Sequence, residues 1–263
     1  MSAGVIAALC PRVFLTHNLR SNARVDQRAL SESRSIQFSL VPAELLIGNR
    51  IGAAQLCLGA SSGTRVYCTI SANVTRPQHF FPGRGHLQVF VHLTPIAGFD
   101  ARASVLSGHL GDFVKSVLLA SGLVDLSRLC IDEGENVWTI SIDIFCLGDN
   151  GNLSAACVLA ASRALRNSRL PELDETRKAV LRHQAFPCGE AMELDPVSVC
   201  LIRLENDQVV TVVDPCFEEE SLAHAQATVV WGQGIVYGTM QLGLLDDQSE
   251  SILKLCDLSV RKP

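Results

Sequence analysis

The amino-acid sequence predicts an α+β protein made of two tandem units, and three observations support this prediction. Residues 137–171 change from the two-residue period of a half-buried strand to the helical spacing of small and apolar residues. A polar, charged stretch at 172–193 then interrupts the pattern. Alternating runs return after it, so we expect an N-terminal arm at 1–33, a first domain at 34–171, a linker at 172–193 and a second domain at 194–263.

The first domain is expected to form a mostly antiparallel, hairpin-rich sheet with helices lying across it. Alternating and β-branched runs predict strands at 35–41, 55–58, 65–71, 87–93 and 138–146. Apolar residues at helical spacing predict one helix over 104–122 and a second over 154–166. The second helix follows an Asp-Asn-Gly-Asn turn, and we expect Pro171 to stop it.

The second domain repeats this pattern with two hairpins and a helix. Its strands are predicted at 197–204, 209–213, 225–231 and 235–242. A final helix over about 247–258 is expected because Asp247 and Glu250 have capping-box spacing. The arm before the first domain reads as extended or partly helical, and its apolar residues 13–15 are suited to docking on the body.

Composition narrows the possible functions. The 263 residues are 48% hydrophobic and only 19% charged, which excludes a disordered or low-complexity chain. No apolar run approaches the roughly 20 residues that a bilayer span requires, so we expect a soluble protein. The formal net charge of -5 is a poor match for a free-standing nucleic-acid binder, so partners would supply much of the positive potential for any RNA.

The cysteine and histidine patterns predict neither disulfides nor metal. The ten cysteines include no CxxC pair, and no convincing signal peptide precedes them, so we expect reduced thiols in the cytosol or nucleus. The seven histidines are dispersed without zinc spacing, and we predict no structural metal and no cofactor. An alternative for the N-terminus is an organelle transit peptide, because no acidic residue precedes Asp26.

Three stretches that occur in order along the chain resemble RNase PH-like proteins. The segment 141–171 is similar to the strand, glycine turn and Ala-rich helix at the centre of their first domain. Residues 24–34 resemble their N-terminal RPDGR…E.R motif, although Val25 and Gln27 depart from the usual Pro and Gly. Residues 212–220 resemble the VDP…EEE strand of their second domain. The resemblance implies a first domain like domain 2 of ribosomal protein S5, a smaller RNase PH C-terminal-type domain, and assembly into six-membered rings.

The resemblance also implies that the catalytic site is degenerate. Active relatives hold phosphate with an Arg in the turn and carry a pair of aspartates on the second-domain strand. Here Leu153 stands at the Arg position, Asp149 and Asp214 remain, and Glu220 falls at the second aspartate. The Arg-rich helix of active members is reduced to Arg102. A leucine cannot donate a hydrogen bond, and losing one such donor typically costs about a hundredfold in rate, so we expect no catalytic residues.

For the acidic residues of this region we favour structural roles over catalytic ones. Asp149 is expected to shape its turn or cap the following helix, and Asp214 to end its strand before Pro215. The glutamates at 218–220 could hold a metal, but three consecutive carboxylates usually form a solvated face, and a two-residue shift in register would exchange Glu220 for Glu218. The GxSxG match at 59–63 is expected to be a hairpin turn, because a further strand follows it.

The loop at 76–86 mixes cationic and aromatic side chains with Pro and Gly. Arg76 and Arg84 could meet phosphates while bases stack on rings, as in single-stranded RNA binding. Phe80 and Phe81 could instead anchor a neighbouring subunit. We favour this subunit interface over RNA binding, and RNA binding over local packing.

We therefore interpret the chain as similar to the non-catalytic RNase PH-like ring subunits of the eukaryotic exosome. That resemblance implies partners: other RNase PH-like subunits in a hetero-hexameric ring, S1/KH cap proteins, a hydrolytic nuclease subunit and threaded single-stranded RNA, without a membrane. It also implies that the protein is located in the nucleus, including the nucleolus, and in the cytoplasm. The alternatives are a phosphate-dependent 3'-to-5' exoribonuclease acting as a homo-oligomer, and an RNA-binding adaptor outside any ring.

Overall fold

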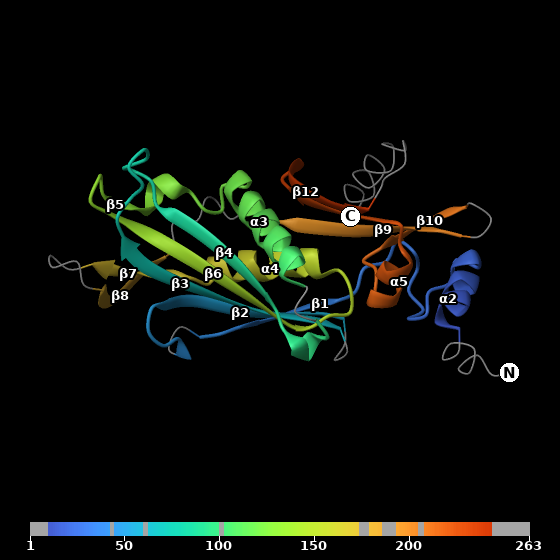
Figure 1. Cartoon of the computed structure of the whole chain (residues 1–263). Helices are drawn as coiled ribbons and strands as arrows, with labels where there is room; N and C mark the ends of the chain where they lie inside the picture. The colour runs from blue at the N-terminus through green and yellow to red at the C-terminus, as the bar shows by residue number, and fades with distance from the viewer. Residues whose placement is uncertain are drawn as a thin grey trace.

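The computed structural model describes residues 10–42, 45–59, 63–99, 103–173, 179–185, 193–204 and 208–243. These residues form an elongated body in which two long helices lie between a six-stranded sheet and a four-stranded sheet (Figure 1). The α+β prediction is confirmed. Within the described residues, no helix has both the length and the apolarity needed to cross a membrane.

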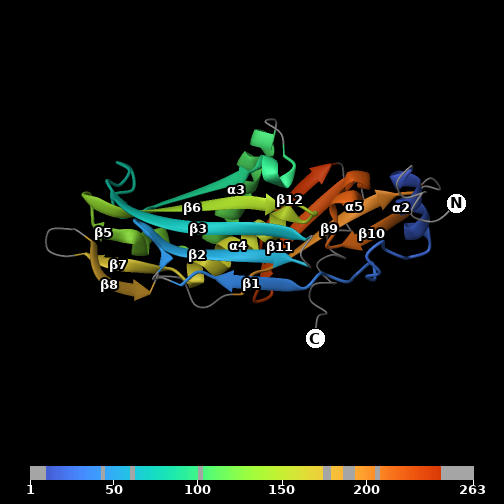
Figure 2. The ribbon, with the colours of Figure 1, turned by 90° about the horizontal axis from the view of Figure 1, so that it is seen from below.

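The six-stranded sheet contains all five strands predicted for the first domain. Its path, shown face-on in Figure 2, is β1 (Ile36–Leu40), β2 (Arg50–Leu58), β3 (Thr64–Thr75), β6 (Asn136–Gly148) and β4 (His86–Leu93), with β5 (Cys130–Asp132) paired to β6. All pairs are antiparallel except β4 and β6. Because β2 and β3 form a hairpin, the GxSxG match is not a strand-to-helix elbow, as expected.

Both predicted helices of the first domain pack on the same face of this sheet. They are α3 (Ser104–Ala120) and α4 (Leu153–Arg166), and two short 3-10 helices, η2 (Pro95–Ala97) and η4 (Leu126–Leu129), connect nearby elements. The alternation read from the sequence is confirmed in β6, where Ile140, Ile142 and Ile144 are fully buried. The role given to Pro171 is wrong: α4 ends five residues earlier, and Pro171 lies in a strand.

The second sheet contains the four strands predicted for it. Its order is β10 (Val209–Val213), β9 (Asp195–Arg203), β11 (Ala225–Gly232) and β12 (Ile235–Gly243), and a short helix α5 (Phe217–Leu222) follows β10. Gly238 of β12 allows close packing on α3, since a Cβ there would lie 2.7 Å from a methyl group of Val117. The predicted helix at 247–258 lies outside the described residues.

The stretch predicted as a linker contains a strand. Strand β8 (Ala179–Ala185) pairs antiparallel with β7 (Arg169–Leu173) as a separate two-stranded sheet. The sequence pattern of this stretch did not indicate a strand, because charged residues obscure any alternation.

The N-terminal arm contains helix α2 (Pro11–Arg20), which packs at the end of the second sheet (Figure 1). Leu19 joins a buried cluster with Ile202 and Val212, and Leu15 is buried as well. Docking is thus confirmed for Leu15 and wrong for Val13, which is 58% exposed. The arm links the start of the chain to the second domain.

Candidate functional site

The turn between β6 and α4 is fixed by side chains on both sides. Asp149 Oδ1 accepts a hydrogen bond from the backbone N–H of Gly151 at 3.0 Å, so the predicted turn-shaping role is confirmed. Thr64 Oγ1 accepts from Asn150 N at 3.0 Å and donates to Gly151 O at 2.6 Å. Gly151 has φ +78°, and a Cβ there would lie 2.5 Å from the carbonyl oxygen of Pro215. The turn therefore touches the second domain through its backbone.

Asp214 follows the last residue of β10, as expected, and its carboxylate binds side chains from two distant segments of the chain. Its carboxylate accepts from Arg34 Nη2 at 2.8 Å, from Arg28 Nη1 at 3.0 Å and from Asn152 Nδ2 at 2.6 Å. Burial alone would raise the pKa of Asp214, but the hydrogen bonds and charge of Arg34 outweigh it and lower the pKa to about 2. The N-terminal arm, the first-domain turn and the second domain meet at this one carboxylate.

The guanidinium of Arg34 donates hydrogen bonds to the Asp214 carboxylate and to backbone carbonyl groups. Beyond Asp214, it donates from Nη1 to Asn150 O at 2.8 Å, and from Nη2 to Gly151 O and Pro215 O, both at 3.2 Å. The guanidinium thus clamps the turn to the end of β10. The sequence placed Arg34 in a recognisable motif but gave no signal of this role.

A second buried pair joins the arm to α5. Arg24 Nε and Nη2 donate to the two carboxylate oxygens of Glu219 at 2.9 and 2.6 Å. The solvated face expected for residues 218–220 is therefore wrong for Glu219, which is 2% exposed, whereas Glu220 is half-buried and Glu218 is exposed. The physical reason is a counter-charge from Arg24, 195 residues away, which the local sequence cannot reveal.

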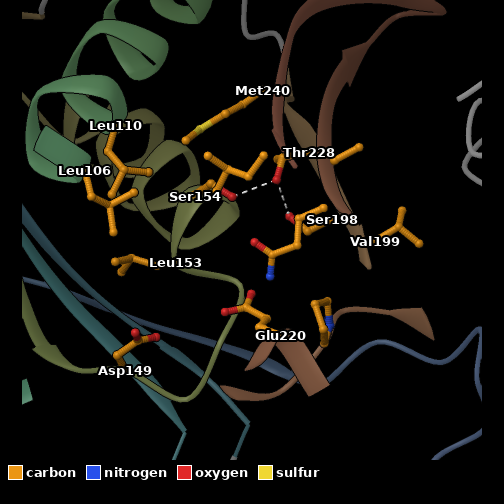
Figure 3. Close-up of a pocket in the computed structure, with 14 residues that line it drawn as sticks. Leu106, Leu110, Asp149, Leu153, Ser154, Ser198, Val199, Glu220, Thr228 and Met240 are labelled. Carbon is orange, nitrogen blue, oxygen red and sulfur yellow. Dashed lines mark hydrogen bonds between the residues drawn. The ribbon is translucent and has the colours of Figure 1, made fainter. Parts of the chain in front are cut away.

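A cavity of about 90 Å³ lies where α3, α4 and the second sheet meet (Figure 3). Leu106 and Leu110 of α3 and Met240 of β12 form apolar walls, and Asp149 and Glu220 lie on the opposite side. Leu153, the first residue of α4, is nearly buried between these groups. The fold thus brings together three of the four degenerate positions, and Asp214 adjoins them through Asn152.

Glu220 bridges α5 to the start of α4. Its Oε1 accepts from the backbone N–H of Asn152 at 2.7 Å. Burial raises the pKa of Glu220 to about 7, and the charge of Asp149 adds to this effect, while the Asn152 N–H opposes it. Burial also raises the pKa of Asp149. Because Glu218 is exposed, the residue of the glutamate run that faces the turn is Glu220.

Three hydroxyl groups in the cavity form a chain that the sequence did not reveal. Thr228 Oγ1 lies 2.7 Å from Ser154 Oγ and 2.8 Å from Ser198 Oγ, as the dashed lines in Figure 3 show. The chain connects α4 to β9 and β11 across the domain boundary. Nothing in the spacing of single serines and threonines indicates it.

The structure places the residues of the 76–86 loop at the surface. Arg76 and Arg84 are exposed, as are Phe80 (87%) and Phe81 (51%). The Arg84 guanidinium carbon lies 5.3 Å from the centre of the Phe81 ring, a cation–π contact. The remaining candidate RNA contact, Arg102, lies outside the described residues.

A groove of about 490 Å³ runs beside this loop. Arg84 and His86 line it from the loop side, and Lys115 lines it from α3. Lys115 was not singled out from the sequence, although it is the only Lys or Arg in α3. Its position as the one Lys or Arg of this helix is the signal that could have identified it.

Thiols and metal ligands add no further site in the described part of the chain. The eight cysteines found there are free thiols, and no three His, Cys, Asp or Glu side chains gather as metal ligands.

The long, mostly antiparallel sheet, the two covering helices and the smaller second sheet define a two-domain α+β chain of the RNase PH type. The chain belongs to the 3' exoribonuclease (RNase PH) family, whose domain 1 matches residues 32–171. It is 32% identical over 225 residues to "Exosome complex component Rrp42" of Archaeoglobus fulgidus, covering 83% of this chain and 79% of the relative. It is 27% identical to "Exosome complex component rrp45" of Schizosaccharomyces pombe, covering 87% and 77%.

Solved structures agree with this assignment. A chain from "archaeoglobus fulgidus exosome with RNA bound to the active site" superposes with a TM-score of 0.77 at 30% identity, covering 94% of this chain and 92% of that one. A chain of an "Archaeal exosome core" gives 0.76 at 28% identity, covering 97% and 93%. The predicted family and fold are confirmed.

Proposed function

We propose that this chain is a non-catalytic subunit of the RNase PH-like ring of an RNA exosome, where it shapes the ring and its RNA channel. Its similarity to archaeal and fission-yeast proteins named as exosome components supports the ring assignment. The observation that carries the non-catalytic part is the cavity at the start of α4, which is lined by Leu153 and two carboxylates.

The chemistry of the cavity argues against phosphorolysis. That reaction needs inorganic phosphate held by cationic and hydroxyl donors beside the scissile linkage. Among the described residues that line the cavity there is no Lys, Arg or His, and Asp149 and Glu220 would repel an anion. The charge of Arg34 reaches Glu220, but its donors are engaged with Asp214 and the turn carbonyls.

The size of the cavity points the same way. At about 90 Å³ it is several times smaller than the roughly 300–1,000 Å³ of ordinary small-molecule sites. It has room for a few water molecules or one small anion, not for the terminal nucleotide of an RNA chain. A structural role for this region, in which Asp214 and Arg34 fasten the two domains, fits these observations better.

Contacts with RNA or with a neighbouring subunit are assigned to the 76–86 loop and its groove. Arg84 and Lys115 on the two sides of the groove could meet phosphates, and base stacking on Phe81 would contribute roughly 1–3 kcal/mol per base. Phe80, at 87% exposed, is the side chain best placed to enter a neighbouring subunit. The proposed partners are sister RNase PH-like chains, S1/KH cap proteins and a hydrolytic nuclease. The proposed locations of the protein are the nucleus, the nucleolus and the cytoplasm.

The non-catalytic assignment is tested on the tagged complex purified from cells, with single-stranded RNA and with or without inorganic phosphate. We expect Asp149→Ala in this chain to leave any phosphate-dependent release of nucleoside diphosphates unchanged. Release that is abolished by Asp149→Ala, and retained with Asp112→Ala on α3, would overturn the proposal and establish a phosphorolytic enzyme.

The loop is tested with paired variants in the same complex. If Phe80 is an interface anchor, Phe80→Ala weakens incorporation into the ring, whereas Ile96→Ala, which removes a side chain that is 85% exposed elsewhere, does not. If the groove binds RNA, Arg84→Gln lowers RNA affinity and reduces the salt slope by about one. Arg65→Gln, at an exposed position on β3, is the control for lost positive charge.

A further inference from the structure

The face of the six-stranded sheet that α3 and α4 do not cover carries aromatic side chains. Figure 2 looks onto this face, with the two helices behind the sheet. In β6 the fully buried Ile142 and Ile144 point toward the helices, so Asp143 and Phe145 point to the uncovered face. The same alternation in β4 places Phe90 on that face, where it is 48% exposed.

Strand pairing gathers these aromatic side chains around the carboxylate of Asp143. In the register of β4 with β6, Phe90 lies opposite Asp143 and His92 lies opposite Phe145. In the register of β3 with β6, Tyr67 lies opposite Phe145. Neighbouring strands are about 4.8 Å apart and same-face residues of one strand about 6.6 Å apart, so a side chain bound at Asp143 can reach Phe90 and Phe145. We call these five residues the Asp143 platform.

The Asp143 carboxylate has no permanently charged partner among the described residues. Its Oδ1 lies 2.9 Å from His92 Nε2, and the His92 ring stacks on the Phe145 ring with a centroid distance of 4.6 Å. No Lys or Arg in the described part of the chain forms a salt bridge with Asp143, whereas Asp26 and Asp214 each pair with an arginine. The Asp143 side chain is 32% exposed, so a cation from another molecule can reach it.

A carboxylate bordered by aromatic rings favours a cation over a phosphate. The face of an aromatic ring attracts a cation that lies within about 6 Å of the ring centre. The planar guanidinium of an arginine can stack on such a ring while its N–H groups donate to a carboxylate, which a lysine ammonium does less well. The phosphates of a nucleic acid would be repelled by the charge of Asp143. The platform therefore matches the chemistry of an arginine side chain.

We propose that the Asp143 platform is a docking site for an arginine side chain of a partner protein. The guanidinium donates to the Asp143 carboxylate and stacks on the exposed ring of Phe90. The partner is thus a protein segment with an exposed arginine, and not an RNA strand. The platform lies on the opposite face of the sheet from the cavity at the start of α4, so the inference does not depend on whether that cavity is catalytic.

The test is binding of a short acetylated and amidated peptide with a single arginine to the full-length chain. The backbone amide resonances of residues 88–92 and 141–145 are followed by NMR, and we expect saturable shifts there. Asp143→Asn keeps an acceptor oxygen for His92 but removes the charge, and it should weaken binding of the peptide about tenfold or more. Asp112→Asn, at an exposed position on α3, is the matched control and should leave binding unchanged.

The role of the aromatic ring is tested in the same way. Phe90→Leu should weaken binding of the arginine peptide roughly threefold, because the cation–π contact is lost while the apolar surface remains. Phe80→Leu removes an exposed ring in the 76–86 loop and should have no effect. On the unaltered chain, the same peptide with citrulline, which has the shape of arginine without its charge, should bind about tenfold more weakly. A lysine peptide should also bind more weakly than the arginine peptide.

Equal binding of the arginine and citrulline peptides overturns the inference. Because that comparison uses the unaltered chain, it decides the question even if Asp143→Asn does not fold. Absence of saturable shifts at residues 88–92 and 141–145, or an equal loss of binding in Asp112→Asn, overturns it as well. Binding of single-stranded RNA at these residues, strengthened by Asp143→Asn, would assign the face to nucleic acid and refute a protein partner.

Discussion

Replacing Glu220 by Gln should change how the stability of the protein depends on pH. Burial raises the pKa of this carboxyl group from 4.5 to about 7 in the folded chain. Between these values the folded state binds more protons than the unfolded state, so the free energy of unfolding falls as the pH rises. The contribution is fully present below about pH 4.5 and is lost above about pH 7.

The magnitude follows from the same two pKa values. At 1.36 kcal/mol for each pH unit, the rise from 4.5 to about 7 corresponds to roughly 3 kcal/mol. Glutamine keeps the size of the side chain and its acceptor oxygen for the Asn152 N–H but cannot ionise. The unaltered chain should therefore lose about 3 kcal/mol relative to Glu220→Gln between pH 4.5 and pH 8.

The assay is urea unfolding at several pH values across this range. Trp138 lies in the first sheet and Trp231 in the second, so fluorescence reports on both domains, and circular dichroism checks that the transitions coincide. Glu218→Gln, at an exposed position, should show no such divergence. A constant difference between Glu220→Gln and the unaltered chain across pH 4.5–8 would refute the reasoning, because Glu220 would then ionise as it does in water.

Three further substitutions test the contacts between the domains. Asp214→Asn should cost roughly 2 kcal/mol at pH 7 because Arg34 lowers the pKa of Asp214 from 3.8 to about 2; the difference in unfolding free energy from the unaltered chain should shrink as the pH falls through about 2. Gly151→Ala should destabilise the chain by about 2 kcal/mol or more, seen as a lower Tm, since φ is +78° and the new Cβ would meet backbone atoms; no change in Tm would contradict the packing described. Glu219→Gln leaves Arg24 buried without its carboxylate and should cost about 3–5 kcal/mol in urea unfolding, and a loss below 1 kcal/mol would show that the pair is not desolvated.

The sequence was sufficient for elements with strong periodicity. Strand β6 and helix α4 were predictable because one face of each is uniformly apolar or small, as Ile140 and Ile142 show. Strand β8 and helix α5 were not, since β8 has no regular alternation and lies in a charged stretch, while three glutamates make α5 resemble a solvated surface. In α5 that resemblance misleads because Glu219 is neutralised by a residue near the other end of the chain.

The candidate site was predictable only in part for the same reason. Asp149, Leu153 and Glu220 could be identified by their place in a family motif, and the fold brings them to one cavity. The partners that give these residues their properties come from segments far away in the sequence. Arg34 at Asp214 is separated from it by 180 residues, and the spacing of neither motif specifies the contact.

The measurement that tests the central claim most directly is affinity purification of the tagged protein from its own cells at mild salt, followed by native mass determination. We predict one ring-sized particle that contains several different RNase PH-like chains in near-equal amounts. A lone chain, or a homohexamer that shortens RNA only when phosphate is present, would contradict the account and would establish an independent phosphorolytic enzyme.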